Sequence, residues 1–284
     1  MSFAKAELRK YDTSEVCRIL KVSRSGYYRP SHSSEREEKE EEKAVVNCFE
    51  QNHGNYGRIR IRKALLAKGV DVSEYRIARI LRENGLYAKS GRTGKKRAPR
   101  PSEKQYIEEN LIKDKFAVKQ ANGLWCSDIT ELIYRGGKLY LCGIIDVATR
   151  RLVGWSIKKH QRQELVHSCI EMAVGRNPQR TEGAVFHSDR GCQYTANKTK
   201  EIVELYGFRK SMSRPGTPSD NQPIESFWRT LKLEMPSIRR LSFEEASWTI
   251  VRYIELYYNS QRIHSALGYT APNHFLTLLP VHYS

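Results

Sequence analysis

The sequence predicts an α/β protein in which small helical units precede a domain built on a mixed sheet. Three observations lead to this fold class. Residues 1–87 carry short helical patterns, residues 123–159 hold three consecutive β-rich segments, and residues 163–213 alternate between helix and strand patterns. A strand meander followed by alternating helices and strands is typical of a sheet with antiparallel and parallel pairs.

Residues 1–34 are expected to form the first helical unit. In "YDTSEVCRILKVSRSGYYRP", Thr13 or Ser14 can cap a helix, and a tight break precedes "SRSGYY". The apolar stripe of this helix is Val16, Ile19 and Leu20. A short helix, a turn and a basic second segment outline a helix-turn-helix, an outline that many small helical pairs share.

Residues 35–87 are expected to form an acidic connector and a second DNA-binding unit. Six glutamates between Glu35 and Glu42 indicate a solvated helix. Two helices then follow, in 58–69 and 72–85, each ending at a glycine. The second helix turns Ile77, Ile80 and Leu81 inward and Arg76, Arg79 and Arg82 outward. This arginine stripe suits DNA phosphates, and a solvated face is the alternative interpretation.

Residues 88–116 are expected to link the helical units to the sheet. Between Ala88 and Lys104 there are seven basic residues, one acidic residue and little apolar content. Such a segment can follow a DNA backbone.

The mixed-sheet domain is expected to span residues 117–236. Its strands are predicted at 123–134, 138–150, 151–159, 182–189 and 208–213, with helices at 163–176 and 197–207. The C-terminal extension, 237–284, begins with a long helix from Phe243 that turns Trp248, Val251 and Ile254 inward.

The segment "SDNQPIESFWRTLKLE" is predicted to contain the last helix of this domain. Pro223 suits the first helical position, which places Glu225 in the first turn. Phe227 and Leu231 form a buried stripe, whereas Glu225, Arg229 and Lys232 share the opposite face. This face either presents a metal ligand next to two cations that contact DNA phosphates, or it is a solvated face with ion pairs.

The composition indicates a nucleic-acid partner. Among 284 residues, 49 lysines and arginines stand against 32 acidic residues, a net charge of +17. The sequence has no apolar run of about 18 residues and no signal-peptide core, so no segment is expected to span a bilayer and a cytoplasmic location is expected. Six scattered cysteines without a CxxC pair argue against zinc and disulfide sites.

Three carboxylates have positions that suggest chemistry. Asp128 interrupts an apolar strand, where an unpaired carboxylate is costly to bury, and Asp189 ends another strand. Together with Glu225 they can bind Mg²⁺, which prefers carboxylate oxygens and keeps waters that phosphate oxygens can replace. Two such ions about 4 Å apart can hold the attacking and leaving oxygens of a phosphoryl transfer.

Five sequence blocks, in order along the chain, carry a resemblance to a known family: "LWCSDITEL", "GIIDVATRRLVGW", "FHSDRGCQYTA", "SDNQPIESFWRTLKLE" and "YNSQRIHSALGYTAP". The chain resembles the second-reading-frame transposases of the IS-three family, whose core is similar to retroviral integrases. The 35 residues between Asp189 and Glu225, and the basic Lys232, match the family pattern. The "CRILKVSRSGYYR" and "YGRIRIRKALLAKG" segments match its helical regions.

The resemblance implies an RNase H-like fold with Asp128, Asp189 and Glu225 as the metal-binding triad. It further implies two Mg²⁺ ions, for which Mn²⁺ is expected to substitute. The expected DNA contacts are Arg76, Arg79, Arg190, Arg229, Lys232 and Arg262. His187 and Arg190, which flank Asp189, either orient it, contact DNA or are structural, and Asn259, Arg262 and His264 either contact DNA or pack. Asp146 is expected to be structural, and Cys126, Cys142 and Cys192 to be core or neutral residues.

The expected partners are the terminal repeats of the insertion sequence, the target DNA, a second copy of the chain and the first-reading-frame product. Family members commonly act as a fusion of both frames, and this sequence shows no leucine-zipper heptads. The expected activity is DNA cleavage at element ends and strand transfer. The alternatives are a hydrolysing nuclease of the same fold and a non-catalytic DNA-binding regulator, although three carboxylates would repel DNA in a pure binder.

Overall fold

The computed structural model describes residues 13–19, 21, 35–89, 111, 120–178, 183–214 and 218–279. Of the first expected helical unit, helix α2 (Thr13–Ile19) belongs to this part. Most of that unit, and most of the expected linker 88–116, lies outside the described residues. None of the helices in the described ranges combines the length and apolar character that a bilayer crossing requires.

The described part of the core is organised around one mixed sheet. Its strands are β1 (Leu124–Tyr134), β2 (Gly137–Asp146), β3 (Leu152–Lys158), β4 (Val185–Ser188) and β5 (Arg209–Met212), in the spatial order β3-β2-β1-β4-β5. The first three strands form an antiparallel meander, and β4 and β5 add to β1 in parallel. The predicted mixed sheet is therefore confirmed.

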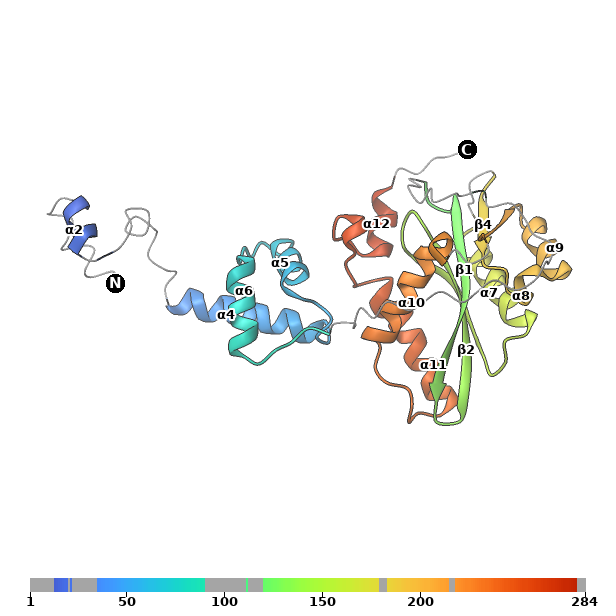
Figure 1. Ribbon diagram of the computed structural model, residues 1–284, viewed down its shortest axis with the longest axis horizontal. Helices are drawn as coiled ribbons and strands as arrows, with labels where there is room; N and C mark the ends of the chain where they lie inside the picture. Colours follow the sequence, from blue (N-terminus) through green and yellow to red (C-terminus); the bar gives the residue numbers. More distant parts are fainter. Residues whose placement is uncertain are drawn as a thin grey trace.

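Helices cover both faces of this sheet (Figure 1). One face carries α7 (Gln163–Arg176), α8 (Cys192–Thr195) and α9 (Asn197–Leu205), and the other carries α10 (Gln222–Glu234) and α11 (Phe243–Arg252). Successive side chains of a strand point to opposite faces of the sheet, so one strand can contribute to the hydrophobic core on each face. In β1, Leu124 and Cys126 join the core beneath α10 and α11, whereas Trp125 joins the core beneath α7.

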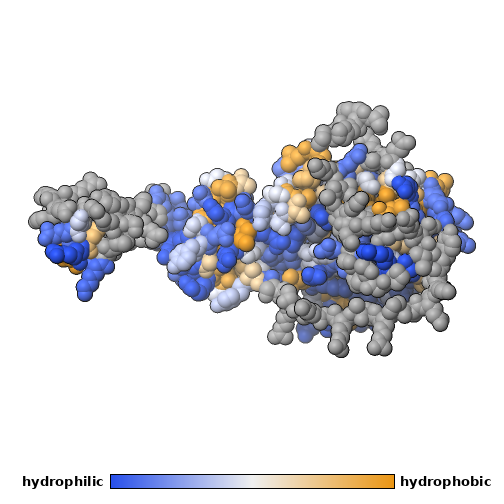
Figure 2. Space-filling view, turned by 45° about the horizontal axis from the view of Figure 1, so that its top comes forward, coloured by the Kyte–Doolittle hydropathy of each residue, from blue (hydrophilic) through white to orange (hydrophobic). Residues whose placement is uncertain are grey.

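The helical unit before the sheet consists of α4 (Glu35–Gln51), α5 (Arg58–Leu66) and α6 (Glu74–Glu83). Its core includes Val45, Ile61 and Ile77, all completely buried. The Ser73 hydroxyl caps α6 by accepting a hydrogen bond from the Arg76 amide. Hydrophilic side chains predominate on this unit in Figure 2, with apolar ones scattered among them.

The C-terminal segment differs from its prediction. Helix α11 continues as a π-helical turn, η2 (Tyr253–Tyr258), and is followed by η3 (Ser265–Leu267) and α12 (Pro272–Leu278). The prediction that Trp248 faces inward is wrong, because its side chain is 69% exposed. The buried stripe instead runs through Ala246 and Ile250, and Trp248 lies about 200° around the helix from Ala246.

The helical unit docks on this C-terminal segment. The Tyr56 hydroxyl accepts a 2.9 Å hydrogen bond from the Ile263 amide, and Asn55 Nδ2 donates to the Tyr257 hydroxyl at 3.1 Å. Lys89 Nζ donates to the backbone oxygen of Glu234 at 3.0 Å. Because buried side chains of the helical unit bond to backbone and side-chain groups of the segment they face, this is a specific contact between the two units.

Candidate active site

Asp128 lies within β1, opposite Gly143 of β2. Its Oδ2 accepts a 3.0 Å hydrogen bond from the Trp228 indole, which belongs to α10. Burial raises the pKa of Asp128 to about 7, and the nearby charges of Asp189 and Glu225 contribute to the rise. A buried carboxylate with a raised pKa beside two others is unfavourable unless a ligand compensates its charge.

Asp189 follows the last residue of β4, which pairs with β1 in parallel so that Ser188 lies beside Ser127. The register therefore brings Asp189 next to Asp128, at the carboxyl end of β4. The Gly191 amide donates a 3.0 Å hydrogen bond to Oδ1 of Asp189. Burial raises the pKa of Asp189, and this hydrogen bond opposes the rise.

Glu225 lies in the first turn of α10, with its side chain exposed. Asn221, at the N-cap, fixes this end of the helix over the sheet by donating from Nδ2 to the Ser127 oxygen at 3.0 Å. Partial desolvation beside the sheet raises the pKa of Glu225, Arg229 lowers it, and the charge of Asp189 raises it. Each pair among the three predicted carboxylates thus interacts electrostatically.

The three carboxylates are close, but they do not form a closed metal cage. Within the described ranges, no group of three or more His, Cys, Asp or Glu side chains is arranged to hold a metal ion as it stands. Mutual repulsion opposes a tighter approach, and Asp128 and Asp189 bond to Trp228 and Gly191. The chemistry of the donor set nevertheless fits Mg²⁺, which takes hard carboxylate oxygens.

His187 has a structural position. It is completely buried, and its ring nitrogens lie 2.9 and 3.0 Å from the hydroxyls of Ser211 and Ser213. Burial lowers the pKa of His187 to about 4, so the ring is neutral at physiological pH. Of the three interpretations of this residue, packing is the one that these contacts favour. Nearby, Arg190 Nε donates to the Ser213 oxygen at 2.7 Å.

Asp146 and the cysteines have the surroundings expected of structural residues. The Asp146 carboxylate accepts hydrogen bonds from the backbone of Asn122 and Thr149 and from the Thr149 hydroxyl. Cys126 and Cys142 are completely buried, and Cys192 is exposed.

The arginines and lysine predicted to contact DNA differ in their surroundings. Arg229 and Lys232 are exposed on the α10 face that carries Glu225. By contrast, Arg76 pairs with Glu38 and Glu41 at 3.4 and 3.2 Å, and Arg79 lies 3.8 Å from Glu83. A phosphate contact at Arg76 or Arg79 would have to compete with these ion pairs, and each contact stays a prediction.

Near the C-terminus, Asn259 and Arg262 are engaged in packing. Asn259 bonds the backbone of Leu152 at 3.0 Å through both side-chain atoms. Arg262 is 4% exposed, and its guanidinium makes two 2.7 Å hydrogen bonds to the buried carboxylate of Glu234. His264 Nε2 accepts a 3.1 Å hydrogen bond from Nη1 of this same guanidinium. Of the two open interpretations, packing is favoured for Asn259 and Arg262.

Trp228 is the residue at this site that sequence reasoning missed. It lies within the quoted block around Glu225, three residues after that glutamate, on a neighbouring part of the helix surface. The buried charge of Asp128 requires a partner, and this requirement indicated a hydrogen-bond donor such as the Trp228 indole. The sequence did not show which donor reaches it.

Comparison with protein families identifies two kinds of domain in the chain. Residues 118–218 and 206–272 match two models described as "Integrase core domain". Residues 35–94 match a model described as "HTH-like domain".

Several relatives are similar over most of their length. The transposase for insertion sequence element IS904 of Lactococcus lactis is 37% identical over 81% of this chain and 91% of its own length. The 31 kDa protein of insertion element IS600 from Shigella sonnei is 36% identical, over 92% and 97%. Transposase InsF of IS3A from Escherichia coli is 32% identical, over 94% of each chain.

Solved structures give weaker likenesses. The HTLV-2 integrase catalytic core in complex with magnesium is 17% identical, covers 54% of this chain and 94% of its own, and has a TM-score of 0.39. A simian T-cell lymphotropic virus intasome chain is 14% identical, covers 84% and 78%, and has a TM-score of 0.45.

Proposed function

Since the chain belongs to the family of integrase-core transposases of IS3-type insertion sequences, we propose that it cleaves DNA at the ends of such an element and transfers the freed 3′-hydroxyl to target DNA. Family membership supports a DNA transposase, an enzyme of the polynucleotidyl transferase type. The RNase H-like mixed-sheet fold expected from the resemblance is confirmed.

The convergence of Asp128, Asp189 and Glu225 is the observation that carries the proposal. Three chain segments, in β1, after β4 and in α10, bring these side chains within electrostatic reach of one another. A binding module gains nothing from three carboxylates facing a polyanion, because they repel it. A phosphoryl transferase needs them to hold cations against phosphate oxygens.

In this proposal, the three carboxylates would hold two Mg²⁺ ions, for which Mn²⁺ substitutes. Bound Mg²⁺ supplies Lewis acidity to the oxygens that enter and leave the phosphorus. Trp228 keeps the Asp128 carboxylate oriented through its indole hydrogen bond.

Exposed cations on α10 position the DNA strand in this proposal. Arg229 lies one turn after Glu225, and Lys232 lies two turns after it, about 10 Å along the helix axis. Lys232 would therefore meet a phosphate neighbouring the one under attack. Charge reversal in Lys232→Glu should weaken DNA binding more than Lys232→Ala, because it adds repulsion beside the backbone.

We propose roles for the other segments from the same family membership. Residues 117–236 form the catalytic core, 35–87 contribute DNA binding, 88–116 are a linker and 237–284 are a C-terminal extension. Pairing two element ends requires at least two copies of the chain, and the first-reading-frame product is a further partner. The protein acts at the bacterial nucleoid, where its DNA substrates lie.

Strand-transfer assays with purified protein, labelled element-end duplexes and Mg²⁺ test this function. Asp128→Asn, Asp189→Asn and Glu225→Gln should each lose nicked and joined products while DNA affinity stays the same or rises. Glu131→Gln is the matched control, because it removes an exposed carboxylate from the same strand as Asp128.

The products also separate the alternatives. Joining by any of the three variants contradicts the triad. Nicks without joined products in the wild type indicate a nuclease of the same fold. DNA binding without either product indicates a non-catalytic regulator.

A further inference from the structure

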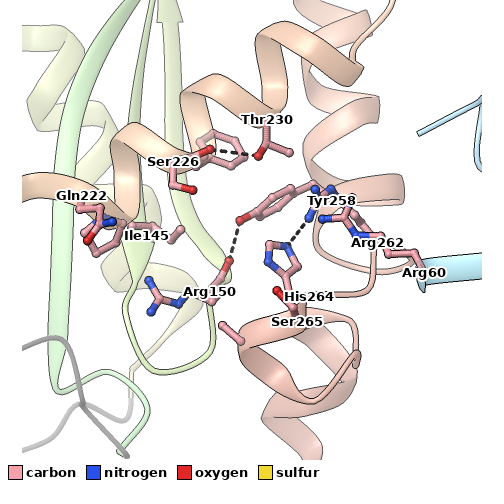
Figure 3. Close-up of a pocket in the computed structure, with 13 residues that line it drawn as sticks. Arg60, Ile145, Arg150, Gln222, Ser226, Thr230, Tyr258, Arg262, His264 and Ser265 are labelled. Atoms are coloured by element: carbon pink, nitrogen blue, oxygen red, sulfur yellow. Dashed lines mark hydrogen bonds between the residues drawn. The ribbon is translucent and has the colours of Figure 1, made fainter. Parts of the chain in front are cut away.

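A polar cavity lies beside the helix that carries Glu225. It has a volume of about 300 Å³ and lies between α5, the turn after β2, α10 and the C-terminal segment. Figure 3 shows Gln222 and Ser226 of α10 on one side, Arg150 below them, and His264 and Ser265 on the C-terminal side. Its lining also includes Arg60, Thr230, Tyr258 and Arg262.

The cavity has an excess of positive charge. Three guanidinium groups line it, those of Arg60, Arg150 and Arg262. The carboxylate that faces them is Glu234, which bonds Arg262 at 2.7 Å and lies 4.0 Å from Arg60. One carboxylate against three cations leaves the cavity suited to an anion.

Arg150 is the cation with the most capacity for a ligand. In the described part of the chain, its guanidinium has neither a hydrogen-bond nor an ion-pair partner, and its side chain is half-buried. Its backbone is held in the left-handed region, at φ +57°, and its carbonyl accepts a 3.1 Å hydrogen bond from the Tyr258 hydroxyl. The backbone of the turn at Arg150 is therefore fixed, and the Arg150 guanidinium can still bind a ligand.

His264 and Arg262 form the inner wall. The 3.1 Å contact between Arg262 Nη1 and His264 Nε2 requires Nε2 to accept, because a guanidinium only donates. His264 is therefore neutral, in keeping with a pKa lowered to about 3 by burial and then by Arg262, Arg60 and Arg150. With Arg262 committed to Glu234 and His264, Arg150 and Arg60 are the donors for a ligand.

The cavity is adjacent to the catalytic face of α10 without being part of it. Gln222, Ser226 and Thr230 are spaced four residues apart, and this row lies about 100° around the helix from Glu225. An α-helix is about 10 Å across, so a strand held at Glu225 can reach this row with a neighbouring phosphate.

We propose that this cavity is a phosphate-binding subsite that holds a backbone phosphate of a DNA strand next to, and separate from, the phosphodiester at Asp128, Asp189 and Glu225. The choice of DNA as the anion rests on the proposed function. Arg150 makes the principal contact, and the Ser226 and Ser265 hydroxyls contribute donors. Because Arg60 comes from α5, the docked helical unit completes the subsite.

The test measures DNA affinity against salt concentration for a labelled duplex of arbitrary sequence, without divalent metal. Arg150→Gln should weaken binding and reduce the slope of log affinity against log salt by about one, the signature of one lost phosphate contact. Arg150→Lys keeps the charge and should retain most of the slope. Ser265→Asp, at an exposed rim position on another segment, should also weaken binding.

Arg209→Gln is the matched control. It makes the same charge change at an exposed residue that begins β5, at the end of the parallel strands opposite Asp189. Equal slopes and affinities for the wild type, Arg150→Gln and Ser265→Asp overturn the subsite. An equal loss in Arg209→Gln also overturns it, because the effect would then be one of general charge.

Inorganic phosphate distinguishes the two sources of this anion. If phosphate stabilises the wild type but not Arg150→Gln, while their salt slopes with DNA are the same, the cavity takes a free anion and the DNA assignment is wrong. Since no measurement here depends on catalysis, an inactive protein with the expected slopes would refute the proposed function and leave the subsite standing.

Discussion

The indole nitrogen of Trp228 donates a 3.0 Å hydrogen bond to Oδ2 of Asp128. The two residues are 100 positions apart, one on α10 and the other inside β1. Trp228 is 6% exposed and packs over Gly143, the residue paired with Asp128 across the sheet. This contact fixes the relative position of two of the three segments that bring the carboxylates together.

Replacing Trp228 with phenylalanine removes this donor and keeps most of the buried ring. Strand transfer should fall about 10- to 100-fold, the usual effect of losing a hydrogen bond that orients a metal-binding carboxylate. Metal-free DNA affinity should not change. Trp155→Phe is the control, because its indole donates a 2.7 Å bond to Glu255, away from the carboxylates. Full activity in Trp228→Phe would show that the bond has no part in the reaction.

A methyl group at Gly143 should disturb the same contact from the other side. A Cβ there would lie 2.7 Å from Trp228 Cη2, so the indole that bonds Asp128 must shift. Gly143→Ala should destabilise the protein by about 1–3 kcal/mol, as overpacking does, and also reduce strand transfer. Chemical denaturation and strand-transfer rates check the two effects.

Gly154→Ala is the control for the clash itself. Its Cβ would lie 2.6 Å from Ala173 Cβ and from the Cys169 oxygen, beneath α7 and far from Trp228 in the packing. At least as much destabilisation is expected there, because backbone atoms give way less than a side chain, with normal activity per folded molecule. The same ratio of activity to stability in both variants would count against a role for Gly143 in placing Trp228.

The elements that the sequence predicted well are those with a local periodicity. The burial of Phe227 and Leu231 and the exposure of Glu225 follow from a 3.6-residue repeat within one helix. The meander β1–β2–β3 follows from adjacent β-rich segments with short turns. Such patterns need no knowledge of how distant segments pack.

Contacts between distant segments could not be predicted in this way. The Trp228–Asp128 bond depends on the path of α10 across β1, and the bond of Tyr56 to Ile263 depends on how the helical unit docks. Hydrophobicity alone also misplaced Trp248, because the small Ala246 fits the core position that the larger residue was expected to fill. Shape complementarity decided these positions.

His264 should make stability depend on pH. Its pKa is lowered from about 6.5 in the unfolded chain to about 3 in the fold by burial, with Arg262, Arg60 and Arg150 adding to the effect. The unfolded state therefore binds an extra proton below pH 6.5. The stabilisation is complete above that pH and is lost as the pH falls toward the folded pKa.

His264→Phe isolates this contribution, because the phenyl ring can keep the edge-to-face contact with Tyr258. Between pH 7.5 and pH 5, the wild type should lose up to about 2 kcal/mol relative to the variant. Urea denaturation at both pH values gives the difference, and titration of all other groups cancels in it. A pH-independent difference would mean that His264 is not protonated preferentially in the unfolded chain.

The Arg262–Glu234 pair provides a test that separates packing from DNA contact. Both side chains are at most 5% exposed, and the guanidinium makes two 2.7 Å bonds to the carboxylate. Arg262→Ala should cost about 3–5 kcal/mol of unfolding free energy, because Glu234 is then left buried without its main partner. The double variant Arg262→Met, Glu234→Leu should recover most of this loss, since replacing a whole buried pair is often close to neutral.

DNA affinity of the double variant then decides the predicted role of Arg262. The double substitution removes one positive and one negative charge, so the net charge near the DNA is unchanged. If Arg262 is a packing residue, affinity and salt slope should match the wild type once folding is complete. If Arg262 binds a phosphate, the slope should fall by about one despite normal stability. Because its donors are already committed to Glu234 and His264, we expect the first result.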